Sequence, residues 1–564
     1  MASLTSCGDF LDKSPDTRVY LQNVEQLREL MLDAYVDASY APVCELPTDN
    51  IIDNNSPDDE GTLYNKTEYS LGDNQLYIWE DVDASTNSND DPSGPWQRCY
   101  RAIAACNAVL DAADEIEAEG LDSDDQETLN GVRGEAYMSR AFHHFLLAQI
   151  FCMPYRGPEL SKSEQGIPYM TEPETTVKPH YERGTLAETY EHIQADIEKG
   201  LALIDDGIYE VPKYHFNKQA ANAFAARFYL FTRQYDKVVE YATAAFNGND
   251  PATLMSDIWE KGGSMYYISD IGRYATSIDR PGVFMLFSSF TTWWRRFVSS
   301  GRYACNRDAK RATVQGPGPT WKNLRWRNNR NESFSMHPCF NGLCGSASGS
   351  EYGMYYAGNC FEQFEYTNKI AGIGYCHGVN AEFTAEQTLL DRAEAYLFLG
   401  NIEAAVADLS TWEYGHSKSY RSQYSQLIEL TADAITNFYR EDKDPGFGIM
   451  KEIHVDQVCP SDKYSLTDEI KPYLQCVQHF RRIETVHTGR RWWDIKRFGL
   501  TYSHKYGPYD TYTLQVLDKR YAIQIPVQSL VAGFEPNTRE TSTEITSSEA
   551  VRPITVKPAQ DDED

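Results

Sequence analysis

Hydrophobic residues recur at helical spacing between residues 99 and 250. One run contains Tyr100, Ile103 and Leu110, a second contains Ala136, Ala141 and Phe145, and a third contains Ile193, Ile197, Leu201 and Ile204. Positions three or four residues apart lie on one face of an α-helix, so each run predicts an amphipathic helix with one buried side. We therefore expect this part of the chain to be a succession of packed helices.

Two segments of the chain match each other in sequence. Residues 226–239 correspond to residues 393–406. Each segment predicts a helix that ends near Arg233 or Gly400, a tight turn and a second helix, as in tetratricopeptide-like hairpins. A hairpin of this kind needs a neighbour to bury its second face. The repeat therefore predicts a mostly α fold built on about four stacked hairpins.

Two long segments lack the helical period. Residues 40–95 and 250–385 are rich in Gly, Ser, Asn, Pro and aromatic residues. This composition predicts irregular loops, which we expect to pack over one side of the helical scaffold. Because binding residues concentrate on loops held by a rigid scaffold, these segments are the expected place for ligand contacts.

Composition narrows the classes of function. The chain has 52 Lys and Arg against 83 Asp and Glu, a formal net charge of −31. Such a charge argues against polynucleotide binding and against adsorption to anionic lipid. No stretch reaches the ~18–20 consecutive apolar residues of a membrane-spanning helix. Aromatic residues make up 13% of the chain, and many lie in the predicted loops, where exposed rings are typical of a binding face.

The N-terminus carries a short run of small residues that ends at Cys7. This pattern predicts cleavage before Cys7 and acylation of its thiol, and an ordinary thiol near a frayed terminus is the alternative. The apolar region that precedes such a cysteine in an export signal is absent, because Met1 to Ser3 is too short to supply it. The pattern thus indicates a truncated or re-initiated start, and a membrane contact made only through lipid.

The C-terminal region has a distinctive block of charged and aromatic residues. Residues 480–484 and 489–499 are similar to the E-x-x-x-E-G-x-R-x-x-D-x-x-R-x-G block of the SusD/RagB family, nutrient-binding lipoproteins of the Bacteroidetes outer membrane. His487 and Thr488 depart from it, since an acidic residue usually precedes the glycine there. Further similar segments follow in family order at residues 8–35, 96–107, 140–142, 391–396 and 521–526.

This resemblance implies both a fold and a role. It implies a SusD-like protein that captures oligosaccharides at the cell surface, without a cofactor, and delivers them to a SusC-like TonB-dependent transporter. An oligopeptide-binding member of the same family, or a helical-repeat interaction scaffold without a small ligand, are the alternatives. The expected organisation is an anchor and tether at residues 1–20, a single domain at 21–540 and a disordered Ser/Thr/Glu-rich tail at 541–564.

The C-terminal block has a structural interpretation. Asp494 can pair with Arg490 or Arg497 at helical separations of four and three residues, while Trp492 and Trp493 supply packing area. We expect these residues, and also Arg482 and Glu484, to support the fold rather than to contact a ligand.

The sequence shows no catalytic motif. There is no Gly-x-Ser-x-Gly elbow, no His-Glu-x-x-His and no phosphate-binding Gly-rich loop, and no pair of carboxylates is distinguished by its setting. His143 and His144 are neighbours in a predicted helix, so only one is expected to face the core, as a structural histidine. We therefore predict a protein that is not an enzyme and has no metal site.

The chain has 12 cysteines without paired CxxC spacing. Five of them crowd one loop-rich segment, where a disulfide or buried free thiols are both possible. They are Cys305, Cys339, Cys344, Cys360 and Cys376.

Aromatic side chains in the loops are the candidate binding residues. Sugar rings stack their C–H faces on such rings, and Asn, Asp, Arg and Gln take their hydroxyls. The candidates are Tyr77, Trp79, Trp293, Trp294, Arg295, Trp321, Arg325 and Trp326. Core packing is the alternative for each ring, and Trp96 is assigned to the core.

Basic residues cluster between 295 and 330. They are Arg295, Arg296, Arg302, Arg307, Lys310, Arg311, Lys322, Arg325, Arg327 and Arg330. The cluster could attract an acidic glycan, face an acidic transporter surface, or solvate the loops.

Overall fold

The computed structural model describes residues 21–539 and 555–556, with gaps at 58–60, 64, 67–69, 84–89, 175–180, 257–267, 291–300, 315, 322–325, 328–332, 335–343, 346–354, 357–359 and 424–428. Cys7 and the rest of the predicted anchor lie outside these residues. So does most of the predicted tail.

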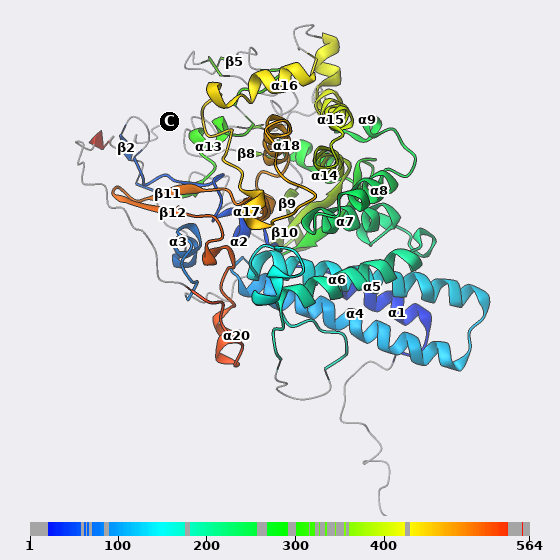
Figure 1. The fold of residues 1–564 in the computed structure, drawn as a ribbon. Helices are drawn as coiled ribbons and strands as arrows, with labels where there is room; N and C mark the ends of the chain where they lie inside the picture. The colour runs from blue at the N-terminus through cyan, green and yellow to red at the C-terminus, as the bar shows by residue number, and fades with distance from the viewer. Residues whose placement is uncertain are drawn as a thin grey trace, which may run out of the picture.

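Packed helices form the N-terminal part of the molecule. They are α1 (Val24–Leu30), α4 (Ser93–Glu119), α5 (Ser123–Phe151) and α6 (Leu186–Leu203), which pack side by side (Figure 1). Asp122 caps α5 by accepting from the backbone N–H groups of its first turn, and Thr185 and Glu188 form a capping box on α6. The helices predicted from the hydrophobic period are confirmed.

The internal repeat forms two matching helix pairs. They are α7 (Lys218–Phe231) with α8 (Tyr235–Ala245), and α14 (Ala385–Phe398) with α15 (Ile402–Gln423). At the turns, Arg233 and Gly400 occupy equivalent positions, and both are left-handed, with φ of 57° and 78°. Gln234 N–H donates to the Tyr229 carbonyl oxygen, as Asn401 N–H does to that of Tyr396. The predicted hairpins are confirmed.

The helix pairs stack in series. α14 packs on both α7 and α8, with the rings of Tyr235 and Phe398 stacked 4.7 Å apart. α18 (Lys471–Glu484) closes the stack against α14 and α15, and α19 (Arg490–Phe498) follows it. One hydrophobic core runs through these helices, from Val36 to Ile525. The mostly α fold is confirmed.

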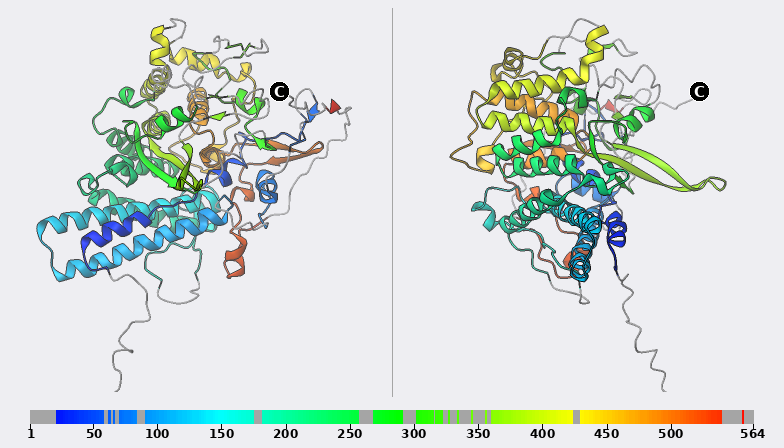
Figure 2. Two further views of the ribbon diagram at one scale, coloured as in Figure 1. Left: turned by 180° about the vertical axis from the view of Figure 1, so that it is seen from behind. Right: turned by 90° about the vertical axis from the view of Figure 1, so that its right-hand side faces the viewer.

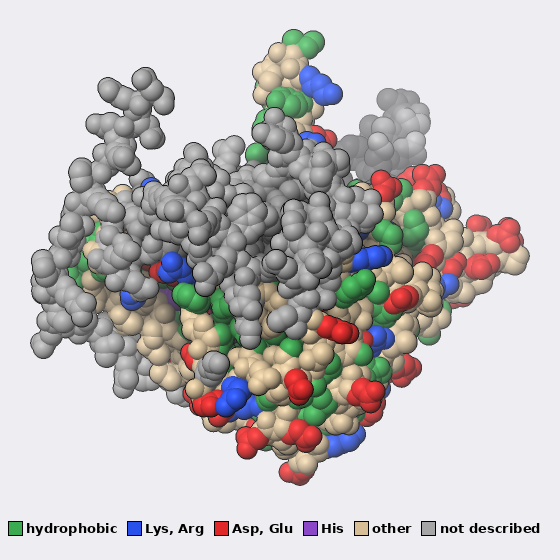
Figure 3. All heavy atoms as spheres, turned by 90° about the horizontal axis from the view of Figure 1, so that it is seen from above, with side chains coloured by type: hydrophobic (Ala, Val, Ile, Leu, Met, Phe, Trp, Pro, Cys, Tyr) green, Lys and Arg blue, Asp and Glu red, His purple; other side chains and the backbone are tan. Residues whose placement is uncertain are grey.

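The segment 250–385 is not wholly irregular, contrary to our prediction. Strands β3 (Val283–Ser289), β9 (Cys360–Asn368) and β10 (Ile373–Thr384) form an antiparallel sheet in the order β3-β10-β9. The β9–β10 hairpin projects from the body, and hydrophobic side chains lie along it (Figures 2 and 3). Residues 40–95 also contain short helices, α2 (Ala41–Glu45) and α3 (Leu71–Tyr77), and the start of α4.

The other described elements are short. Antiparallel pairs form between β11 (Tyr502–Tyr506) and β12 (Asp510–Leu514), and between β1 (Ile52–Asp53) and β4 (Tyr303–Ala304); β13 (Thr555–Val556) runs parallel to β2 (Thr62–Leu63). Short helices are α9 (Pro251–Leu254), α11 (Ile268–Ala275), α13 (Arg307–Arg311), α16 (Ala432–Phe438), α17 (Val455–Val458) and α20 (Val527–Val531). Within the described residues, no helix has the length and apolarity needed to cross a membrane.

Candidate functional site

The C-terminal block forms a buried ion-pair network. Arg497 donates to Asp494 at 2.9 Å and to Glu394 of α14 at 2.7 Å, and Arg481 donates to Glu394 at 2.6 Å. Although burial alone raises the pKa of Glu394, the charges of Arg497 and Arg481 hold it below its ordinary value. The pairing of Asp494 with Arg497 is confirmed. These contacts fasten α18 and α19 onto the helix pairs.

Arg490 does not pair with Asp494, the other partner that the spacing allowed. Its guanidinium lies 2.9 Å from a carboxylate oxygen of Glu382 in β10, which Arg227 of α7 also contacts, at 3.0 Å. The Tyr40 hydroxyl donates to the other Glu382 oxygen at 3.0 Å and accepts from Arg490 Nε at 3.3 Å. Four separate parts of the chain thus meet at one buried carboxylate. Helical spacing cannot reveal such a partner.

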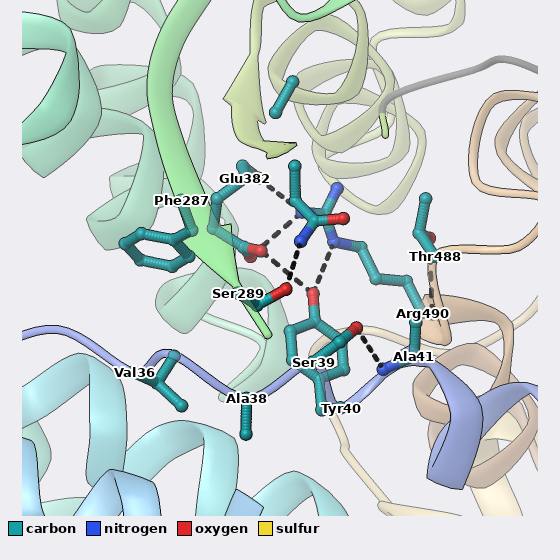
Figure 4. A pocket seen from close by; sticks show the side chains of 12 residues that line it. Val36, Ala38, Ser39, Tyr40, Ala41, Phe287, Ser289, Glu382, Thr488 and Arg490 are labelled. Atoms are coloured by element: carbon teal, nitrogen blue, oxygen red, sulfur yellow. Dashed lines mark hydrogen bonds and ion pairs between the residues drawn. The ribbon is translucent and has the colours of Figure 1, made fainter. Parts of the chain in front are cut away.

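A pocket opens above this cluster (Figure 4). The polar ends of Tyr40, Glu382 and Arg490 point toward one another there, and other polar and apolar side chains line the rest of the pocket. The polar ones are Ser39, Ser289, Asn380 and Thr488, and the apolar ones are Val36, Ala38, Ala41, Phe287 and Ala381. The pocket is small, because the space that its walls leave free is about 20 Å³, enough for about one water-sized group.

The polar side chains of this pocket can form hydrogen bonds. Asn380 donates weakly to the hydroxyl of Ser289, at 3.4 Å, and Ser39 accepts from the Ala41 N–H at 3.2 Å. Hydroxyl and amide groups beside an apolar wall can hold a small polar group such as a sugar hydroxyl. Among the residues lining the pocket there is no serine paired with a histidine, as nucleophilic catalysis would require.

Glu45 binds the segment at His487 and Thr488, where the sequence departs from the family pattern. Its two oxygens accept the backbone N–H groups of His487 and Gly489, each at 3.0 Å, and Asn50 donates to it at 3.1 Å. Burial raises the pKa of Glu45 to about 7. An acidic residue distant in sequence therefore holds the turn that precedes α19.

Arg482 and Glu484 support the fold, as predicted. Arg482 is buried and donates to the Asn50 side chain and to the Asp49 carbonyl oxygen, both at 2.8 Å. Trp412 Nε1 donates to buried Glu484 at 3.3 Å.

Tyr77 and Trp79 lie in the core. Both rings stack on the His504 ring, with centroids 4.1 and 4.6 Å away. The Tyr77 hydroxyl donates to the Lys505 carbonyl oxygen at 3.1 Å, and Trp79 Nε1 donates to that of Pro47 at 2.9 Å. Both side chains are buried, so these rings pack in the core, which is the alternative that the sequence left open.

Trp321 is also a core residue. Its side chain is fully buried, Nε1 donates to the Gly316 carbonyl oxygen at 3.0 Å, and the ring packs beside Phe480 and over Gly318. A methyl group on Gly318 would lie 2.0 Å from that ring, so the glycine makes this packing possible.

The remaining candidates lie outside the described residues. They are Trp293, Trp294, Arg295, Arg325 and the side chain of Trp326. Within the basic cluster, Arg302 is buried and contacts Asp53 at 2.9 Å, whereas the Arg311 side chain is 37% exposed. Arg302 therefore stabilises the fold, whereas Arg311 is partly exposed to solvent.

His143 and His144 both face the core, contrary to our expectation that only one would. Packing covers α5 on most sides: His143 accepts from the Val36 N–H at 3.0 Å and His144 from the Met170 N–H at 3.1 Å. Burial lowers the pKa of His143 to about 4, so its ring stays neutral. Their role is structural, as predicted.

The remaining candidate groups are thiols and acidic side chains. Cys305 is a buried free thiol and Cys376 lies in β10, while the side chains of Cys339, Cys344 and Cys360 lie outside the described residues. In the part of the chain that is described, no group of His, Cys, Asp and Glu side chains is arranged to hold a metal ion.

Known proteins share both sequence and fold with this chain. Residues 9–230 match a SusD-like family described as starch-binding and associating with the outer membrane. No curated protein matches in sequence.

The solved structures share the fold at low identity. A SusD superfamily protein from Bacteroides thetaiotaomicron VPI-5482 has a TM-score of 0.55 and 16% identity, over 92% of this chain and all of that one. A putative sugar binding protein from Bacteroides vulgatus ATCC 8482 has a TM-score of 0.57 and 16% identity, over 92% and 99%. A SusD-like carbohydrate binding protein from the same strain has a TM-score of 0.51 and 15% identity, over 91% and 97%. This chain thus shares the fold of SusD superfamily structures, and its residues 9–230 are similar in sequence to a SusD-like family.

Proposed function

We propose that this protein captures oligosaccharides at the cell surface and delivers them, uncleaved, to a SusC-like TonB-dependent transporter. The match of residues 9–230 to a starch-binding family associated with the outer membrane carries this proposal. Two proteins of the same fold are named as sugar or carbohydrate binding. A peptide ligand, or an interaction scaffold without a small ligand, are the competing functions.

We propose that residues of the segments predicted as loops contact the ligand. Tyr77, Trp79 and Trp321 are occupied in the core, so the rings left for stacking among the sequence candidates are Trp293, Trp294 and Trp326, with Arg295 and Arg325 beside them. Stacking on one ring contributes ~0.5–1.5 kcal/mol beyond area burial, and every ~1.4 kcal/mol changes affinity tenfold.

Binding without cleavage is directly testable. Calorimetry with neutral glycans, acidic glycans and a peptide digest should give heat with a glycan, and the mass of the bound glycan should not change on incubation. Tight binding to peptides alone would replace the oligosaccharide by a peptide. A shortened glycan would contradict the non-enzymatic role.

Attachment to the membrane is proposed to run through lipid on Cys7. Replacing Cys7 by Ala in a precursor that has an export signal should release the protein from membranes. A variant that still sedimented with membranes in cells lacking the transporter would contradict this anchor.

The transporter is proposed because a surface-anchored binder needs a pore to import what it binds. A lid that opens and reseals over a barrel requires a broad interface. The projecting β9–β10 hairpin fits a protein contact, since Phe364, Tyr366, Ile370 and Ile373 are 47%, 52%, 101% and 60% exposed. Extraction in mild detergent should yield a complex of both proteins, and the monomer alone would argue against the partnership.

A further inference from the structure

An unusual turn precedes α17. Gly446, Phe447 and Gly448 all have left-handed backbone angles, with φ of 83°, 59° and 68°. Glycine adopts such angles without cost, but a bulky aromatic residue does not. A strained backbone of this kind persists only where its surroundings hold it, and it is more frequent at functional sites.

Contacts on both sides hold the turn in place. The Asp444 carboxylate accepts from the Gly446 N–H at 2.9 Å, and buried Arg482 donates to the Gly448 carbonyl oxygen at 3.1 Å. Ile449 is buried directly after the turn and lies against Gly316, where an added methyl group would be 3.3 Å from its side chain. The turn is therefore fixed on the body of the protein.

The aromatic ring of Phe447 in this turn is exposed to solvent and is not buried in the core. Phe447 is 54% exposed, and its ring contacts the Arg311 guanidinium, 5.5 Å from the ring centroid. Among the described residues, the acidic partner of Arg311 is Asp308, at a long distance of 3.9 Å, and the Arg311 side chain remains 37% exposed. An exposed apolar ring thus stands beside N–H donors that still face solvent.

These two side chains have the chemistry that a sugar ring requires. An aromatic ring stacks on the C–H face of a pyranose, and a guanidinium donates to hydroxyl or carboxylate oxygens at its edge. We propose that Phe447 and Arg311 form a glycan-binding subsite of this protein. This inference rests on the proposed function and adds to it a described site outside the aromatic residues that the sequence singled out.

The test begins with the unmodified chain. Affinity electrophoresis in gels containing amylopectin, arabinogalactan, polygalacturonate or chondroitin sulfate identifies which polysaccharide retards it. We expect Phe447→Ala to weaken binding to that polysaccharide about tenfold. Arg311→Met, which keeps an apolar stem, should weaken it severalfold, and more strongly for the two acidic polysaccharides at low salt. Tyr214→Ala removes an aromatic side chain of similar exposure, 46% against 54% for Phe447, and should leave binding unchanged.

A stability measurement separates binding from a structural role. Asn tolerates left-handed angles better than Phe, so Phe447→Asn should unfold at the same or a higher temperature while it loses affinity. Retardation of the unmodified chain with unchanged affinity of both Phe447 variants would overturn the subsite alone. Retardation by none of the four polysaccharides would contradict the proposed function and the subsite with it.

Discussion

Glu45 shows how a single buried side chain can control the pH dependence of stability. Its carboxylate lies in α2 and is held by backbone N–H groups at 487 and 489, yet burial raises its pKa to about 7. An unfolded chain releases this proton near pH 4.3. Between these values the folded state holds a proton that the unfolded state does not.

The first prediction follows from that difference. Because the folded pKa is the higher one, the stability contributed by Glu45 is complete below about pH 4.5 and is lost as pH rises towards 7, by on the order of 2 kcal/mol. Glu45→Gln should therefore reduce the fall in unfolding free energy between pH 5 and pH 7 in urea titrations. Glu25→Gln, at an exposed position, should leave that fall unchanged. Equal pH profiles for Glu45→Gln and the unmodified chain would refute the assignment.

The second prediction concerns the buried network. Removing Arg497 leaves Asp494 with a long contact of 3.9 Å to Arg481 and takes one of two arginine partners from Glu394, and breaking such a buried pair costs ~3–5 kcal/mol. Arg497→Ala should therefore lower the free energy of unfolding by about 3 kcal/mol in denaturant titrations. Arg440→Ala is the control, because its pair with Asp442 is exposed, and no measurable change is expected. A similar small effect of both variants would show that the network does not fasten α19.

Residue chemistry was only partly predictable from the sequence. Asp494 and Arg497 lie three positions apart in one helix, so their contact followed from spacing. Glu382, Tyr40 and Glu45 are brought in from distant segments, and no local pattern marks them. Tyr77, Trp79 and Trp321 lie in loop-like sequence, but a loop that packs against the core buries its rings as a helix does.

At the scale of elements, the two helix pairs repeat one turn geometry. Arg233 and Gly400 are both left-handed, and each turn closes with the same pair of backbone hydrogen bonds. The helices were predictable because their period spans many residues. The β3-β10-β9 sheet was not, since β3 is a continuous apolar run that is buried on both faces, and Gly374 and Gly378 interrupt the alternation in β10.

The third prediction tests the turn of the second repeat. A methyl group on Gly400 would meet no atom within 4 Å, so Gly400→Ala adds backbone strain without a clash. It should lower the free energy of unfolding by ~1 kcal/mol. Gly400→Asn should cost less, because Asn tolerates left-handed angles. Equal losses for both variants in denaturant titrations would show that strain is not the cause.

At the scale of the whole molecule, the described surface carries one long projection from a stacked helical body. The β9–β10 hairpin extends away from the helices (Figure 2), and its tip residue Ile370 is fully exposed. Exposed apolar side chains cost solubility unless a partner covers them. The hairpin extends from a body with a continuous hydrophobic core. This core joins segments from Val36 to Ile525.

The last prediction joins the hairpin to the proposed transporter. If the hairpin contributes to that interface, replacing Ile370 and Ile373 by Ser removes apolar contact area without disturbing the core, because both side chains are exposed. The double variant should fold with an unchanged melting temperature, and the fraction recovered with the transporter from detergent-extracted membranes should fall severalfold. Val531→Ser removes another exposed apolar side chain, 84% exposed, in α20 and should leave recovery unchanged. Full recovery of the double variant would place the interface on another surface, since an apolar contact that forms there must weaken when its side chains become polar.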